Sequence, residues 1–148
     1  MNILALDLAT TTGWASSSGT SGVQSFKPRR GDSPGVRYLN LRAWLSEMYE
    51  IIPFELIAYE QPLHRGGHAT EVLVGMATTV QAWAAEHGVE TTTRRPDEIK
   101  KHAFGKGKGS KLAMMLACEK KFGIEPQDDN HADALWLLSL VQSELAGG

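Results

Sequence analysis

The chain has 148 residues, with 15 Lys and Arg against 17 Asp and Glu, so its formal net charge is −2. This length predicts one domain over residues 1–148, large enough to bury its own core. Apolar residues make up 42% of the sequence, which excludes a disordered chain, and the single cysteine excludes an internal disulfide. Apolar runs fall short of the roughly 18 residues of a membrane span, and residues 1–9 lack the basic start of a signal peptide. We therefore expect a cytoplasmic protein without a membrane partner.

The first part of the sequence predicts three consecutive strands. Residues 2–8 form a short apolar run that is typical of a buried strand. Residues 10–16 and 22–27 alternate in polarity and are separated by a Gly/Ser cluster suited to a short loop.

Helices and strands then alternate along the chain. Apolar periodicity predicts an amphipathic helix over 36–52, with Ser33 and Pro34 at its start. We expect further strands at 55–60 and 89–94, and further helices at 69–87, 96–104, 111–122 and 130–145. Tryptophans at 44, 83 and 136 and methionines at 114 and 115 have the spacing of core residues. The order predicts an α/β fold, a five-stranded mixed sheet with helices on both faces.

Positive charge is concentrated in residues 94–121. This segment has nine basic and three acidic side chains, a net charge of +6, so the rest of the chain carries −8. Clustered positive charge favours a polyanionic partner, because neutralised phosphates release counterions. The alternative is a solvated, lysine-rich surface. The glycines and lysines at 105–111 do not match a phosphate-binding P-loop, and we expect no nucleotide cofactor.

Three acidic residues interrupt or end apolar runs. Asp7 lies inside the first strand, Glu60 ends the strand at 55–60, and Asp133 lies in the first turns of the last helix. Burial of an unpaired carboxylate is costly, so each needs a hydrogen bond, an ion pair or a cation. Any one of them alone is explained as a solvated strand end or a helix-dipole acid. Together they favour a site for Mg²⁺ or Mn²⁺, which prefer oxygen ligands and assist phosphodiester cleavage.

The sequence leaves the fourth ligand open. Asp129 and Asn130 precede Asp133 by four and three positions, so they share its helix face, whereas His131 is expected to point elsewhere. Asp129 and Asn130 are also good N-cap residues, and Asn130 with Asp133 resembles a capping box. Capping and metal binding are equally compatible with this pair.

Four segments in the same order resemble the RuvC family of Holliday-junction resolvases, within the RNase H-like superfamily, and especially its short phage and prophage members. They read LALDLATTTGWA (4–15), AYEQP (58–62), RPDEIKKHAFGKGKGSK (95–111) and NHADAL (130–135). The resemblance implies a ribonuclease H fold and an Mg²⁺-dependent endonuclease that resolves four-way or otherwise branched DNA by paired nicks. It also implies a homodimer, for which the helix at 69–87 is the expected interface, and a location in the bacterial host cytoplasm, with phage origin left open.

The resemblance also assigns roles to individual residues. Asp7, Glu60 and Asp133 match the metal-binding catalytic carboxylates of the family. The family's remaining acid falls on Asn130, so Asp129 or His131 are the candidate replacements. The expected DNA-binding residues are Lys100, Lys108, Lys111, His64 and Arg65, and Leu63 or His64 stands where relatives carry an aromatic residue that stacks on a base.

Two other functions remain open at this stage. One is a junction-binding protein whose metal site has been weakened at Asn130. The other is a different RNase H-like nuclease that acts on RNA or on an RNA:DNA hybrid. In each case we expect the strands that carry Asp7 and Glu60 to be adjacent and parallel, with Asp133 meeting both acids.

Overall fold

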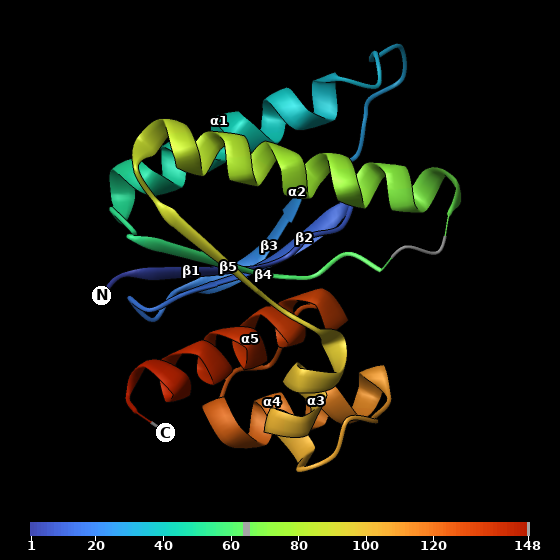
Figure 1. The fold of residues 1–148 in the computed structure, drawn as a ribbon. Coiled ribbons are helices and arrows are strands. Elements are labelled where there is room, and N and C mark those ends of the chain that lie inside the picture. Colours follow the sequence, from blue (N-terminus) through green and yellow to red (C-terminus); the bar gives the residue numbers. More distant parts are fainter. Residues whose placement is uncertain (64–65, 148) are drawn as a thin grey trace.

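The computed structural model describes residues 1–63 and 66–147, which form one five-stranded sheet between two layers of helices (Figure 1). The strands are β1 (Ile3–Asp7), β2 (Thr11–Ser16), β3 (Ser21–Ser25), β4 (Leu56–Glu60) and β5 (Glu90–Arg94). The helices are α1 (Val36–Ile51), α2 (Gly67–His87), α3 (Pro96–Phe104), α4 (Lys111–Phe122) and α5 (Asp129–Leu145). Within the described ranges, no helix is long and apolar enough to cross a membrane.

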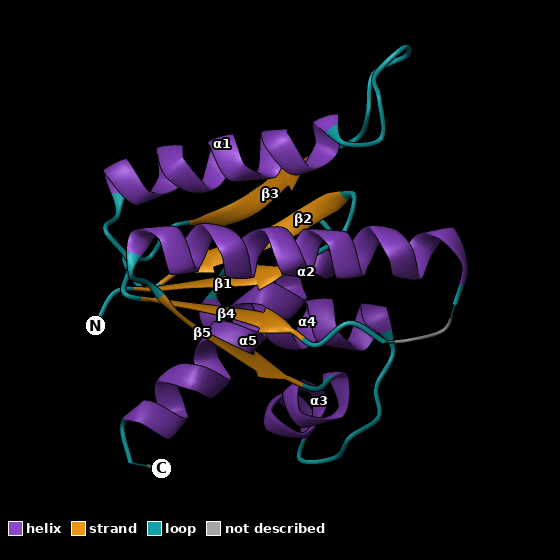
Figure 2. Cartoon of the chain, turned by 45° about the horizontal axis from the view of Figure 1, so that its top comes forward, coloured by secondary structure: helices purple, strands orange, loops and turns teal. Residues whose placement is uncertain are grey.

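The sheet has the strand order β3-β2-β1-β4-β5 (Figure 2). Strands β1, β2 and β3 form an antiparallel meander, and β4 and β5 add to β1 in parallel. In the β1–β4 register Leu6 lies opposite Tyr59, so the next residues, Asp7 and Glu60, end neighbouring parallel strands at the same edge. The prediction that these two strands are adjacent and parallel is confirmed.

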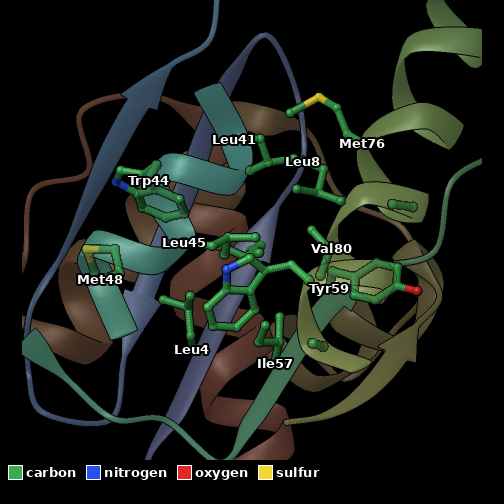
Figure 3. Packing of buried hydrophobic residues seen from close by; sticks show 14 of the residues in the cluster. Leu4, Leu8, Leu41, Trp44, Leu45, Met48, Ile57, Tyr59, Met76 and Val80 are labelled. Atoms are coloured by element: carbon green, nitrogen blue, oxygen red, sulfur yellow. The ribbon is translucent and has the colours of Figure 1, made fainter. Parts of the chain in front are cut away.

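Helices α1 and α2 cover one face of the sheet with large side chains. Leu4 and Leu6 of β1 point toward this layer, where they pack with Trp44, Leu45 and other side chains of the two helices (Figure 3). The predicted core positions of the three tryptophans are confirmed, since all of them are buried. Each large apolar side chain buried here contributes about 1.5–3 kcal/mol.

The opposite face is covered by α5, which packs directly on the sheet, while α3 and α4 pack on α5. Small residues line this contact, including Ala5 of β1 and Ala132 of α5. Trp136 of α5 turns outward to α4, where its indole Nε1 donates a hydrogen bond to the carbonyl oxygen of Met114 (3.3 Å). Met114 is buried as predicted, whereas Met115 is only partly buried.

Two helix starts differ in detail from the prediction. Helix α1 begins at Val36 as predicted, but its N-cap is Gly35, which has no side chain to cap it. Ser33 and Pro34 lie before the helix, and the Ser33 carbonyl oxygen accepts the Val36 backbone N–H (3.1 Å). Helix α5 begins one residue earlier than expected, and its N-cap is Asp128.

Candidate active site

The three acids singled out in the sequence meet at one edge of the sheet. Asp7 ends β1, Glu60 ends β4, and Asp133 lies on the first turns of α5, which covers this face. The Asp7 carboxyl is hydrogen bonded to Asp133 and to Glu60, so the three form one group that we call the acid cluster. Two parallel strands and one helix therefore supply one carboxyl each.

Burial and mutual repulsion raise the pKa values in the acid cluster. Burial raises the pKa of Asp7 well above its usual value, and the charges of Glu60 and Asp133 raise it further. Burial, and next the charge of Asp133, raise the pKa of Glu60 to about 7, although Lys100 and the hydrogen bond with Asp7 act against this shift. In the absence of a cation, the acid cluster therefore holds a proton more tightly than free carboxyl groups do.

The pKa of Asp133 responds to charged side chains of both signs around it. Burial raises its pKa to about 6, and the charge of Asp129 adds to the increase. The hydrogen bond with Asp7 lowers it, as do the charges of Lys100 and Lys111. These lysines lie on α3 and at the start of α4, so basic side chains from two elements border the cluster.

A close backbone contact brings Asp133 to the sheet. Gly13 of β2 is paired with Asp7, and a Cβ at Gly13 would lie only 1.9 Å from the backbone oxygen of Asn130. The Asn130 side chain donates from Nδ2 to the carbonyl oxygen of Thr11 (2.8 Å), which ties the start of α5 to β2. Sequence reasoning did not single out Gly13, although a glycine inside a strand pattern signals close backbone approach.

The N-cap of α5 is Asp128 and not Asp129. Asp128 Oδ1 accepts the backbone N–H of His131 (2.8 Å), so of the two alternatives left open for Asp129 and Asn130, the structure rules out capping. Asp129 instead faces the acid cluster, where its charge raises the pKa of Asp7 and Asp133. Its carboxylate forms an ion pair with Lys111 (3.4 Å).

His131 is part of the packing of α5 and turns away from the acid cluster. It is buried, accepts the Gln127 backbone N–H at Nδ1 (3.0 Å) and contacts the Ser21 hydroxyl through Nε2 (2.8 Å). Because Nδ1 accepts, Nε2 carries the proton and donates to Ser21. The expected orientation of His131 is confirmed.

The basic loop between α3 and α4 is folded against its neighbours. A Cβ at Gly109 would lie 2.2 Å from the Phe104 ring, so a side chain at this position would displace the ring from the loop. Lys108 is exposed in this loop, and Lys111 is 84% exposed at its end. Lys100 and Lys111 therefore lie next to the acid cluster, and Lys108 lies in the loop between their helices. The predicted residues His64 and Arg65 lie outside the described residues.

A largely apolar cavity of about 330 Å³ adjoins Glu60 on the α2 side. Leu8, Leu63 and Leu73 are among its lining residues, and Leu63 is 47% exposed. Leu63, which stands at the position that the resemblance gives to a stacking aromatic residue, therefore lines a cavity next to Glu60.

The donor set suits a hard divalent cation. Asp7, Glu60, Asp133 and Asp129 offer only oxygen atoms, which is the ligand chemistry of Mg²⁺ and Mn²⁺. In the part of the chain that the structure describes, no group of three or more His, Cys, Asp and Glu residues is already arranged around a metal position. A bound cation would remove the repulsion that raises the pKa values of the acid cluster.

The fold is RNase H-like, and the acid cluster lies at the carboxyl ends of two of its parallel strands. No family model matches the chain. It is 30% identical over 113 residues to the crossover junction endodeoxyribonuclease RuvC of Rhodopirellula baltica, and 30% identical over 108 residues to that of Moorella thermoacetica. These matches cover 74% and 71% of this chain but 64% and 65% of the relatives, so the chain spans just under two thirds of their length.

Solved structures agree with the sequence matches. A structure of Thermus thermophilus RuvC in complex with Holliday junction substrate has a TM-score of 0.79 at 20% identity, and covers 99% of this chain and 94% of that one. The yeast mitochondrial Holliday junction resolvase Ydc2 has a TM-score of 0.63 at 12% identity, over 98% of this chain and 82% of that one. In sequence and in fold, the chain therefore resembles RuvC.

Proposed function

We propose that this chain is a divalent-metal-dependent endonuclease that resolves Holliday junctions or other branched DNA by paired nicks. The observation that carries the proposal is the acid cluster, in which Asp7, Glu60 and Asp133 are held together against their own repulsion. A protein that needed these residues only for packing would be more stable with neutral side chains there. The relatives named as crossover junction endodeoxyribonucleases support the same substrate class.

The acid cluster would hold the metal, with Mg²⁺ as the proposed cofactor and Mn²⁺ as a substitute. When bound, a pair of such cations activates a water and stabilises the leaving oxygen of a phosphodiester. Asp7 lies deepest and contacts both other acids, so it would contribute to either position. We assign Asp129 as the fourth carboxylate, because it faces the cluster while the Asn130 amide is engaged by Thr11.

The lysines would bring the DNA backbone to these acids. Lys100 and Lys111 are close enough to lower the pKa of Asp133, so a phosphate that contacts them lies next to the cluster. The ion pair between Lys111 and Asp129 involves an 84% exposed lysine and contributes at most about 1 kcal/mol. Both partners are therefore available, Lys111 to a phosphate and Asp129 to a cation.

Resolution of a four-way junction needs two symmetrical nicks, so we propose a homodimer with a two-fold axis. The outer side of the α1/α2 layer has exposed apolar side chains, including Leu39 (66% exposed) and Val74 (36% exposed). This layer, with α2 as predicted from the sequence, is the proposed interface.

The test is cleavage of a synthetic four-way junction whose four strands carry separate labels. With Mg²⁺, the wild-type protein should nick two opposite strands symmetrically and leave ends that a DNA ligase reseals, and Asp7→Asn should lower the rate at least about 100-fold. Junction binding without nicking at any Mg²⁺ or Mn²⁺ concentration would favour the junction-binding alternative. Preferential cleavage of an RNA:DNA hybrid would instead favour another RNase H-like nuclease.

A further inference from the structure

A second basic surface lies on the loop that joins β3 to α1. Residues 27–37 contain four basic side chains and a single acidic one, a net charge of +3 in a part of the chain that is otherwise acidic. The basic residues are Lys27, Arg29, Arg30 and Arg37, and we call this segment the β3–α1 basic loop. Lys27, Arg29 and Arg30 are exposed.

Within residues 1–63 and 66–147, no carboxylate forms an ion pair with the basic side chains of this loop. The Asp32 carboxylate accepts the backbone N–H of Arg29 (2.8 Å). It therefore stabilises the backbone turn and is not used in an ion pair with an arginine side chain. Among the described residues, none of the four basic side chains forms an ion pair, whereas Arg42, for example, pairs with Glu86 (2.6 Å). Glu47 of α1 borders the same shallow hollow as Lys27 and Arg29 without forming an ion pair with either.

The topology puts this loop at the same sheet edge as the acid cluster. Strands β1 and β3 run in the same direction, because both are antiparallel to β2. The Phe26 amide donates to the carbonyl oxygen of Thr10 (2.7 Å), so the chain leaves β3 beside the turn that follows Asp7. From there the loop projects beyond α1, at the top of Figures 1 and 2. Two strand spacings separate β3 from β1, about 10 Å.

Positive charge thus lies on both sides of the sheet edge that carries the acid cluster. Lys100 and Lys111 lie on α3 and α4, below the sheet in Figure 1, and the β3–α1 basic loop lies above it. One continuous basic face would suit a linear duplex. Two basic surfaces that flank one acid cluster suit a substrate whose arms leave the reacting strand in different directions.

We propose that the β3–α1 basic loop is a second phosphate-binding surface, which holds the backbone of a duplex arm of branched DNA while Lys100 and Lys111 contact the strand next to the acid cluster. The inference rests on the proposed function and adds the second contact region. Arginine suits this role because its planar guanidinium binds phosphate oxygens in a bidentate manner and stays charged.

The experiment compares Arg29→Ala/Arg30→Ala with Lys120→Ala/Lys121→Ala, which removes the same charge from the opposite end of α4 from Lys111. Affinity for a synthetic four-way junction and for a linear duplex of one arm is measured in EDTA over a range of salt concentrations. Each phosphate contact contributes about 0.9 to the slope of log K against log salt, so the arginine variant should reduce the junction slope by about 1.8. At low salt its junction affinity should fall at least about tenfold, and more than its duplex affinity. The lysine variant should keep the wild-type slope.

The outcomes separate this inference from the proposed function. Equal slopes for the wild type and the arginine variant would overturn the second surface, and so would equal losses on the junction and the linear duplex. Wild-type protein that binds junctions without nicking them would overturn the nuclease proposal only, because the slope comparison uses no cleavage. Wild-type protein that binds neither DNA would overturn both. A thermal melt checks that the arginine variant is folded.

Discussion

The two faces of the sheet differ in the size of the side chains that they place against the helices. On the α1/α2 face, Leu4, Leu6 and Trp83 fill a thick apolar layer. On the α5 face, Ala5 and Ala132 keep the layer thin, and at Gly13 the helix backbone comes so close that even a methyl group would not fit. Each large side chain buries more apolar area than a small one, and the small ones let α5 carry Asp133 to the strand ends. Stability and site geometry are therefore provided by opposite sides of the same strands.

The largest effect is expected from Leu6→Ala, which removes a fully buried side chain from the α1/α2 layer. Such substitutions lower the free energy of unfolding by about 2–5 kcal/mol. Urea denaturation at pH 8 in EDTA measures the loss, and the folded fraction should still nick junctions with Mg²⁺. A loss below about 1 kcal/mol would mean that this layer is not the main source of stability.

Substitution of Asp7, which follows Leu6 in β1 and belongs to the acid cluster, should have the opposite effect and stabilise the metal-free protein. Carboxyls with a raised pKa keep their protons in the folded state at pH values where the unfolded chain has already lost them, so metal-free stability falls as the pH rises from about 4 through about 7. Each pKa unit corresponds to roughly 1.4 kcal/mol. Asp7→Asn should therefore raise the melting temperature in EDTA at pH 8 and change it less at pH 5, and Mg²⁺ should stabilise the wild type but not this variant. A melting temperature below that of the wild type at pH 8 would contradict the repulsion.

Gly13→Ala tests the close approach of α5, with Gly22→Ala as its matched control in the meander. A Cβ at Gly13 meets backbone at 1.9 Å, whereas one at Gly22 meets the Trp14 indole at 3.4 Å. Gly13→Ala should destabilise the protein by about 1–3 kcal/mol and, by displacing Asp133, lower the nicking rate by about 100-fold. Gly22→Ala should change both far less. Equal effects would show that β2 simply does not tolerate a side chain.

Asp129→Asn and Asn130→Asp distinguish the two candidates for the fourth ligand. If Asp129 is that ligand, Asp129→Asn should raise the Mg²⁺ concentration needed for half-maximal nicking at least about tenfold. Asn130→Asp removes a donor and turns a carboxylate toward the carbonyl of Thr11, so it should cost about 1–3 kcal/mol of stability without lowering the Mg²⁺ requirement. A lower Mg²⁺ requirement in Asn130→Asp would instead assign the role to position 130.

The smallest effect is expected from Lys100→Ala/Lys111→Ala, which leaves both packing layers intact. Loss of two phosphate contacts should reduce the salt slope of junction binding by about 1.8, with little change in melting temperature. Lys120→Ala/Lys121→Ala again serves as the control for net charge. An unchanged slope in the Lys100 and Lys111 variant would mean that this part of the basic segment is only a solvated surface.

Local sequence patterns determined much of the fold and the candidate site. All ten elements lie within about three residues of their predicted ends, and the strands that carry Asp7 and Glu60 pair as predicted. The three acids stood out because each interrupts an apolar run, and that cost of burial is visible without any structure. Hydrophobic periodicity, glycine helix ends and proline starts act over a few residues, so the sequence alone carries them.

Only the tertiary structure decided the roles of residues 128–131. Asp128, Asp129 and Asn130 are all good caps by composition, and a helix can begin at any of them. Contacts with strands far away in the sequence make the choice, since Asn130 is bound to Thr11 and His131 to Ser21. The same holds for Gly13 and for the β3–α1 basic loop, because a close backbone approach and a shared sheet edge depend on which segments meet in space. Propensity acts along the chain, whereas these contacts exist only once the sheet and α5 have packed.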